Sequence, residues 1–179
     1  MEIQLLTPDQ LAKIYPEVEE ENWTFRSFLK TLKSKKLDNS VHKTHQELFA
    51  HADCIACANC CRLIVPALND DDVARISRLL GRSDEEFRAE YLEDVDGEWM
   101  INSKPCPFLT ENGCAVYDRR PELCRKYPFT DRKEIQSRLI TLVSNAGICP
   151  VVYEVFERLK TQYRKEYDSY QREMRSYWR

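Results

Sequence analysis

The chain has 179 residues, and its 27 lysines and arginines against 30 aspartates and glutamates give a net charge of −3 at neutral pH. This balance excludes an overall cationic field that would drive nonspecific binding to nucleic acid or to an anionic membrane. The length predicts a single domain over residues 1–179. The four glycines never form a G-x-G pair, which excludes glycine-rich phosphate loops and dinucleotide-binding fingerprints.

No segment approaches the roughly 18 consecutive apolar residues that span a bilayer, and the N-terminal sequence lacks the basic and apolar regions of an export signal. We therefore expect a cytoplasmic protein that does not contact a membrane. The chain contains eight cysteines, a clear excess for its length. Because stable disulfides are rare in a reducing compartment, metal coordination is the favoured explanation. A disulfide framework and buried packing thiols are the alternatives.

The first part of the chain has helical patterns. Thr7 and Gln10 form a capping-box pattern that predicts the start of a helix, and Pro16 is expected to end it. The spacing of apolar side chains predicts a second helix within residues 23–32 and a third within residues 41–52.

A helix is also expected after Asn69, which can cap its N-terminus, and Gly81 is expected to end it. The first turn contains Asp70–Asp72, and we interpret these carboxylates as complementing the helix dipole rather than binding a divalent ion. Ser83 and Glu86 form a second capping box, which predicts the start of the next helix.

Turn residues predict a small β element in the second half of the chain. Asp-Gly at residues 96–97 predicts a turn before a short strand at residues 99–102. Asn-Gly at residues 112–113 lies between two apolar segments, which predicts a hairpin with Cys106 and Cys114 on its two sides.

Apolar and aromatic residues recur every three or four positions over residues 150–178, which predicts a long C-terminal amphipathic helix. Its tyrosines alternate with basic residues, as in some nucleic-acid-binding segments, but most of them lie on the helical stripe. We therefore expect them to pack against the domain or a protein partner, and nucleic acid is disfavoured. The fold class is predicted to be mainly α (α+β), a single compact helical domain with a small β-hairpin element, organised around a cysteine-metal cluster.

The run Cys54-Ile-Ala-Cys57-Ala-Asn-Cys60-Cys61 has a spacing that lets several sulfurs reach one centre. On a continuous helix Cys54, Cys57 and Cys61 would share an arc of roughly 60° and Cys60 would point elsewhere, so one of the adjacent pair could serve a different centre. Eight thiolates could furnish two four-sulfur sites. The predicted metal ligands are Cys54, Cys57, Cys60, Cys61, Cys106, Cys114, Cys124 and Cys149.

Basic residues, among them Arg120 and Arg125, surround Cys114 and Cys124 in the sequence, where they favour the thiolate form and offset the charge of an anionic cluster.

Three histidines, His42, His45 and His51, precede the cysteine run. His51 lies three residues before Cys54 and is the best candidate for an additional imidazole ligand or proton relay. His45 falls on the apolar stripe of its helix, so we expect it to be half-buried and structural. None of the three is included in the predicted ligand set.

Four cysteine-containing motifs occur in this order along the chain: Cys54-x-x-Cys57-x-x-Cys60-Cys61, Cys106-Pro107-Phe108-Leu109, Gly113-Cys114-x-Val116-Tyr117 and Arg120-Pro121-x-x-Cys124-Arg125-x-Tyr127-Pro128. Over about residues 54–150, the predicted cysteine-cluster core, this arrangement resembles the CxxCxxCC family, also called the YkgJ family. The resemblance implies a zinc- or iron-chelating domain, and so a metal site rather than a particular reaction. A longer relative in that family is a flagellin lysine N-methylase, but this chain has no glycine-rich methyl-donor loop.

The identity of the metal is open between an iron-sulfur cluster, such as 4Fe-4S, and zinc. Structural zinc is often held by separated CxxC pairs, whereas a CxxCxxC run with a remote Cys-Pro is typical of iron-sulfur proteins, which favours the cluster. The first hypothesis is a metal-binding protein with a structural, redox or metal-handling role.

Two further hypotheses assign the metal a different purpose. One is a metal-cluster-dependent enzyme for a redox or methylase-like modification, in which Arg120 and Arg125 bind an anionic substrate. The other is a zinc-stapled interaction module whose C-terminal helix docks a protein or RNA. The sequence does not decide whether the protein is an enzyme, although the absence of His-Glu-x-x-His and G-x-S-x-G argues against a hydrolase.

Overall fold

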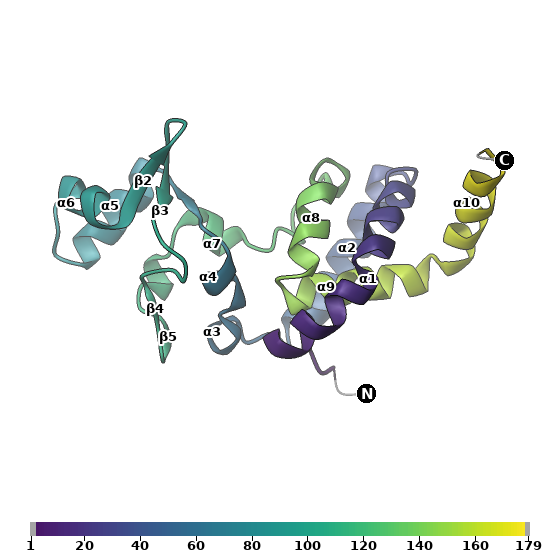
Figure 1. Cartoon of the computed structure of the whole chain (residues 1–179), viewed down its shortest axis with the longest axis horizontal. Coiled ribbons are helices and arrows are strands. Elements are labelled where there is room, and N and C mark those ends of the chain that lie inside the picture. Colours follow the sequence, from purple (N-terminus) through teal and green to yellow (C-terminus); the bar gives the residue numbers. More distant parts are fainter. Residues whose placement is uncertain (1–2, 178–179) are drawn as a thin grey trace. The chain divides into compact units, whose positions relative to one another are not determined.

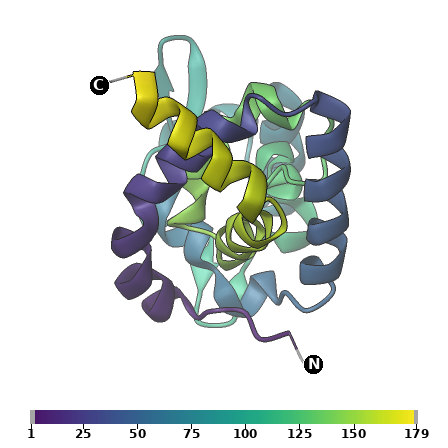
Figure 2. The same ribbon diagram turned by 90° about the vertical axis from the view of Figure 1, so that its right-hand side faces the viewer.

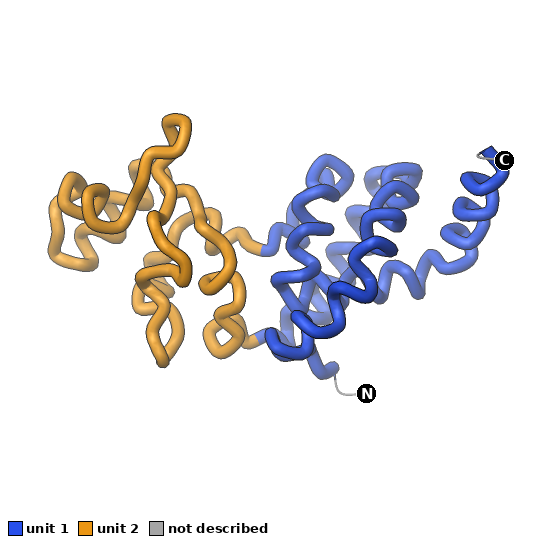
Figure 3. The backbone as a smooth tube through the Cα atoms, in the orientation of Figure 1, with its two compact units in different colours: residues 1–52, 128–179 blue, residues 53–127 orange. Residues whose placement is uncertain are grey.

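Helices make up most of this computed structural model, which describes residues 3–177, and the strands form only small antiparallel sheets (Figure 1). This confirms the predicted mainly α fold class with a small β element. The chain divides into two compact units (Figure 3). Residues 1–52 and 128–179 form the first, which we call the helical unit, and residues 53–127 form the second, which we call the cysteine unit.

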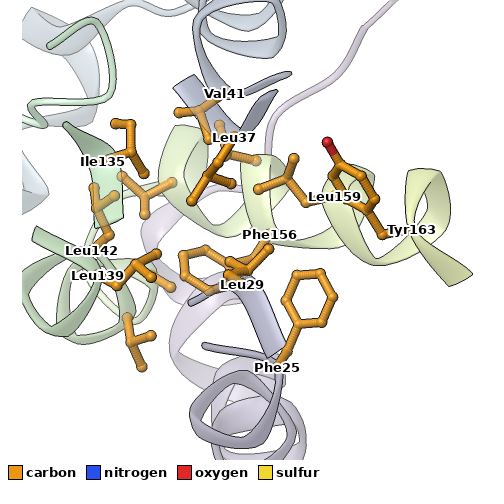
Figure 4. Packing of buried hydrophobic residues seen from close by; sticks show 14 of the residues in the cluster. Phe25, Leu29, Leu37, Val41, Ile135, Leu139, Leu142, Phe156, Leu159 and Tyr163 are labelled. Atoms are coloured by element: carbon orange, nitrogen blue, oxygen red, sulfur yellow. The ribbon is translucent and has the colours of Figure 1, made fainter. Parts of the chain in front are cut away.

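In the described part of the helical unit, residues 3–52 and 128–177, there are five α-helices and one short 3-10 helix. They are α1 (Pro8–Leu29), α2 (Ser34–Phe49), η2 (Ile135–Arg138), α8 (Leu139–Ala146), α9 (Pro150–Gln162) and α10 (Arg164–Tyr177). Figure 2 looks along α9, with α1 and α2 on either side of it. Aromatic and aliphatic side chains from these helices interlock in one apolar core, which includes Phe25, Leu37, Leu142 and Phe156 (Figure 4).

Among residues 3–177, no single helix is both long enough and apolar enough to cross a membrane. Two helical segments, Ile135–Ala146 and Pro150–Gln162, meet the length and composition criteria only as a pair, and they are bent by 116° relative to each other.

The N-terminal helix is longer than the sequence predicts. The capping box of Thr7 and Gln10 is confirmed, with the Thr7 N–H donating to the Gln10 side chain over 2.8 Å. The prediction that Pro16 ends the helix is wrong, because α1 continues through it to Leu29. Proline disrupts a helix interior at a cost of about 3 kcal/mol, and burial of large apolar side chains such as Phe25 further along α1 offsets that cost.

The C-terminal segment forms two helices rather than one. The helix predicted over residues 150–178 is interrupted at Tyr163, where the backbone has φ −103° and ψ 16°, and residue 178 lies outside the described residues. The Tyr163 hydroxyl lies 2.6 Å from the Ser40 hydroxyl, and the ring of Tyr167 packs edge-on against Phe25. The predicted packing of C-terminal tyrosines against the domain is therefore confirmed for these two.

The cysteine unit consists of short elements. They are α3 (Cys54–Cys57), α4 (Asn59–Leu63), β1 (Ala67–Leu68), α5 (Asp70–Leu79), α6 (Asp84–Tyr91), β2 (Leu92–Val95), β3 (Glu98–Ile101), β4 (Leu109–Thr110), β5 (Gly113–Cys114), η1 (Tyr117–Arg119) and α7 (Glu122–Lys126). The first sheet has the strand order β1-β3-β2 and the second is the β4-β5 hairpin, and both are antiparallel. Asn69 and Ser83 are the N-cap residues of α5 and α6, as the sequence predicts.

A separate small core stabilises only part of the cysteine unit. Its buried members come mainly from α5, α6 and the three-stranded sheet, together with Phe108 and Val116. In contrast, α3 and α7 bury no residue, and the one buried residue of α4 is the polar Asn59. The helices that carry five of the cysteines therefore make no contribution to the apolar core.

Candidate metal centre

The cysteine run lies on two short helices that are separated by a sharp break. Asp53 caps α3, because its carboxylate accepts hydrogen bonds from the N–H groups of Ile55 and Ala56 at 3.0 and 2.9 Å. Ala58 then adopts a left-handed conformation with φ 46° and ψ 16°, which ends α3 and begins α4. The arc expected for a continuous helix therefore does not apply, and Cys60 and Cys61 lie on a separate helix from Cys54 and Cys57.

The predicted hairpin is confirmed, with a turn one residue earlier than Asn-Gly. Thr110 pairs with Gly113, and Leu109 pairs with Cys114. Cys106 precedes the hairpin instead of facing Cys114 across it. Its N–H donates to the carbonyl of Cys61 over 2.8 Å, and its own carbonyl accepts from the N–H of Leu109 over 3.0 Å. Two backbone hydrogen bonds thus connect the end of the cysteine run to the hairpin.

Gly113 allows β5 to approach α3 closely, and residues of the two elements are in contact. Its φ is +97°, and a Cβ atom at this position would lie 2.5 Å from Cγ2 of Ile55. Any other residue would therefore be strained and would push the hairpin away from α3. The glycine keeps Cys114 near the run that begins at Cys54.

A clamp on α5 fixes the turn before Cys124. The Asp72 carboxylate, 2% exposed, pairs with Arg75 and accepts the N–H of Glu122 at 3.0 and 3.1 Å. Arg75 donates through Nε to the carbonyl of Arg119 at 3.2 Å and through Nη2 to that of Arg120 at 3.1 Å. Sequence reasoning missed this role of Asp72, because the partners are some 45 to 50 residues away in the chain.

The thiols of the cysteine unit have strongly different pKa values. Burial raises the pKa of the Cys106 thiol to about 11 and that of Cys124 to about 12. The pKa of Cys61 is lowered to about 7, mainly by the hydrogen bond from the Cys60 side chain, with further help from the positive charges of Arg62 and Arg120. Cys61 is therefore the thiol of this group with the strongest thiolate character at neutral pH.

Four of the thiols interact electrostatically with one another. After burial, the charges of Cys61, Cys106 and Cys114 contribute to the raised pKa of Cys124. Cys61 and Cys114 act in the same way on the pKa of Cys106, and Cys61 on that of Cys114. We call Cys61, Cys106, Cys114 and Cys124 the four-thiol group. Burial is likewise the largest cause of the raised pKa of Cys54, and the charges of Cys57 and Cys61 add to it.

The four-thiol group is not arranged as a finished metal site. Within the described part of the chain, no three histidine, cysteine, aspartate or glutamate side chains are grouped so that they could hold a metal ion. The donor chemistry nevertheless fits a metal, because thiolates are the soft ligands that zinc and iron-sulfur clusters use in proteins.

Cys149, the eighth predicted ligand, lies in the helical unit. It is the N-cap residue of α9, its N–H donates to the Asn145 carbonyl over 2.8 Å, and it packs against the apolar core. Its role as a metal ligand stays a prediction.

The histidines of α2 have structural partners. Nε2 of His42 lies 2.8 Å from the carbonyl oxygen of Arg132, and Nδ1 of His45 lies 2.7 Å from the hydroxyl of the buried Thr130. The half-buried, structural interpretation of His45 is confirmed, and burial lowers its pKa. The additional-ligand hypothesis for His51 stays a prediction.

Comparison with protein families identifies a domain in this chain. Residues 53–143 match the family model CxxCxxCC, described as "Putative zinc- or iron-chelating domain". The matched segment contains the whole cysteine unit and extends to α8, and it ends before Cys149. Neither the curated proteins nor the solved structures contain a significant match to this chain.

Proposed function

The chain belongs to the CxxCxxCC family of zinc- or iron-chelating domains, and we propose that its cysteine unit is a thiolate centre that holds an iron-sulfur cluster. The CxxCxxC spacing of Cys54, Cys57 and Cys60 and the Cys-Pro sequence at Cys106 support iron-sulfur over zinc. When bound, such a cluster supplies one-electron transfer or a structural link between its ligands. The reduced thiols that it requires agree with a cytoplasmic location.

One observation carries this proposal: the short helices that carry most of the clustered thiols bury no apolar side chain. Helices α3, α4 and α7 have four or five residues each and bury no apolar side chain. Isolated helices of this length are unstable in water, because the cost of the first turn is not recovered. A metal bound by their cysteines would supply the missing stabilisation, since metal binding free energy becomes folding free energy.

We propose the four-thiol group as the primary ligand set. The mutual electrostatic influence of its members and the backbone bond between Cys61 and Cys106 support this grouping. The remaining cysteines of the run, Cys54, Cys57 and Cys60, would supply the ligands of a second centre, consistent with the idea that Cys60 and Cys61 serve different centres.

Single substitutions to serine test the ligand set. Serine at Cys61 or Cys106 removes a thiolate with little change in volume, so each variant should lose most of its iron and its visible absorption when purified without oxygen. Cys149→Ser is the matched control, and we expect it to keep the full metal content because Cys149 lies in the helical unit, outside the four-thiol group. Full metal content in both Cys61→Ser and Cys106→Ser would overturn the grouping.

If the protein instead binds structural zinc, the metal and sulfide contents of the same preparations would differ. Tightly bound zinc without acid-labile sulfide, lost on substitution of Cys61 but not of Cys149, would retain the thiolate centre and replace the cluster by a structural ion. The search for a protein partner of the C-terminal helix, whose Tyr177 is exposed, would then take precedence.

A further inference from the structure

The net charge of −3 is unevenly distributed, because positive charge is concentrated in the helical unit where α1 meets α2. Two segments, residues 30–38 and 131–138, together contain seven basic residues and three acidic ones. Six of the basic side chains are exposed: Lys30, Lys33, Lys35, Lys36, Arg132 and Lys133. We call these six residues the basic surface.

Hydrogen bonds hold the two segments of the basic surface side by side. The Gln136 side chain donates through Nε2 to the carbonyl of Lys30 at 3.2 Å. The Asp38 carboxylate accepts the N–H groups of Glu134 and Ile135 at 3.0 and 2.9 Å. These bonds join residues 96 to 106 positions apart, so the tertiary structure brings the positive charges of the two segments together.

Most members of the basic surface have no internal counter-charge. Within residues 3–177, no ion pair is formed by Lys30, Lys33, Lys35 or Lys133. Lys36 lies 3.7 Å from Glu166, but both side chains are about half exposed, so this pair contributes little. Arg132 pairs only with the adjacent Asp131, at 3.6 Å. Because like charges at close spacing repel one another, an anionic partner would stabilise this surface.

The composition of the basic surface favours a phosphate backbone over a protein or a membrane. Five of its six members are lysines, and lysine is depleted from protein–protein interfaces. No exposed large apolar side chain lies in residues 30–38 or 131–138, all of which the structure describes. The surface therefore lacks the second anchor that stable membrane attachment needs and the aromatic rings on which unpaired bases stack. Exposed lysines contact the phosphates of a duplex without reading its sequence.

We propose that the basic surface binds the phosphate backbone of double-stranded nucleic acid, independently of base sequence. This activity is separate from the metal centre, because all six residues belong to the helical unit. The prediction that disfavours nucleic acid came from the C-terminal tyrosines, and none of them belongs to this surface. DNA and RNA duplexes share the phosphate chemistry, so the test includes both.

The test is fluorescence anisotropy of a labelled duplex of random sequence, as DNA and as RNA, titrated with the full-length protein from about 50 to 200 mM salt. Contact of all six side chains with phosphates gives a slope of log affinity against log salt of about −5 for DNA. The dissociation constant at physiological salt should be about 10⁻⁴ to 10⁻⁶ M.

A triple variant, Lys33→Gln with Lys35→Gln and Lys133→Gln, removes half of the charge of the surface. We expect it to reduce the magnitude of the slope by about 3 and to weaken binding roughly tenfold per charge at about 50 mM salt. Arginine at the same three positions keeps the charge and should preserve binding. The matched control replaces exposed basic residues outside the surface with glutamine, at Lys13, Arg78 and Lys104. It makes the same change in net charge and should bind as the wild type does.

The proposal is overturned if neither duplex binds at about 50 mM salt. It is also overturned if the glutamine triple variant and the control triple variant weaken binding equally, because only the net charge would then matter. Tighter binding to vesicles containing phosphatidylserine, or to polyglutamate, than to either duplex would contradict the nucleic-acid assignment and indicate a lipid or an acidic protein. If the glutamine triple variant does not fold, Lys133→Gln alone decides: a slope smaller in magnitude by about 1 supports the proposal, and an unchanged slope contradicts it.

Discussion

The two units of this protein differ in how much apolar surface they bury. The helical unit buries aromatic and aliphatic side chains from all of its α-helices in one core, including Phe25, Phe156 and Tyr163. The cysteine unit has a smaller core, confined mainly to α5, α6 and one sheet, and its thiol-bearing helices lie outside it. Small structures with too little apolar burial generally need disulfides or metals.

The difference indicates where a bound metal would matter. In the helical unit, burial of each large side chain contributes about 1.5 to 3 kcal/mol, so the fold needs no further link. In the cysteine unit, backbone bonds, a close glycine contact and the Asp72 clamp hold the segments that carry the thiols, and α3, α4 and α7 bury no apolar side chain. A metal would complete this second arrangement and leave the first unchanged.

The largest effect should follow removal of the metal. Chelation under anaerobic conditions would withdraw a binding free energy that is on the order of 10 kcal/mol for structural zinc. We expect amide hydrogen exchange, followed by mass spectrometry, to become fast in α3, α4 and α7, while α9 stays protected. Equal loss of protection in α9 would contradict the comparison, and so would unchanged protection in all four helices.

Phe156→Ala should break the helical unit selectively. Phe156 is 2% exposed in the apolar core, and truncation of such a side chain costs about 3 to 5 kcal/mol. The free energy of unfolding should fall by that amount in denaturant titrations, and Phe156→Leu should lose less. Iron or zinc per chain should remain at the wild-type level, and a parallel loss of metal would count against separate sources of stability.

Gly113→Ala should disturb the cysteine unit at the contact with Ile55. The substitution combines a strained backbone with a steric clash, which together cost about 2 to 4 kcal/mol. Gly97→Ala is the matched control, because Gly97 also has a positive φ, +87°, but a Cβ atom there would meet nothing within 4 Å. Metal affinity should fall in Gly113→Ala and stay near wild type in Gly97→Ala. Equal affinities would show that the close approach is unimportant.

Asp72→Asn should have a smaller effect on the same unit. It removes the charge that pairs with Arg75 but keeps an acceptor for the Glu122 N–H, so we expect a loss of about 2 kcal/mol in unfolding free energy. Asp71→Asn, at an exposed neighbouring position, should change stability very little. If the two variants were equally stable, the clamp would have no measurable role.

Local features of the sequence predicted the helix starts at Thr7, Asn69 and Ser83, because a cap depends on residues three positions apart. The cysteine spacing likewise indicated a metal-binding segment, which the family match supports. The sequence did not predict the continuation of α1 through Pro16 or the break at Tyr163. Both features depend on packing between helices that are distant in the sequence, and local sequence patterns do not predict such packing.

Several features of the candidate site likewise could not be predicted from the sequence. The left-handed Ala58 is not a residue type that predicts a break, and the contact of Gly113 with Ile55 joins positions far apart in the chain. From the sequence, Asp72 could be interpreted only as one of three carboxylates in the first turn of a helix. Sequence patterns can therefore identify donors, but the residues that bring donors together are determined by tertiary structure.

The most direct measurement is the content of iron, zinc and acid-labile sulfide per chain, together with the visible spectrum, in the full-length protein purified without oxygen. An iron-sulfur centre in the cysteine unit predicts iron and sulfide in near-equal amounts and a brown chromophore. Zinc without sulfide would contradict the cluster, and a chain that holds neither metal would contradict the thiolate centre itself.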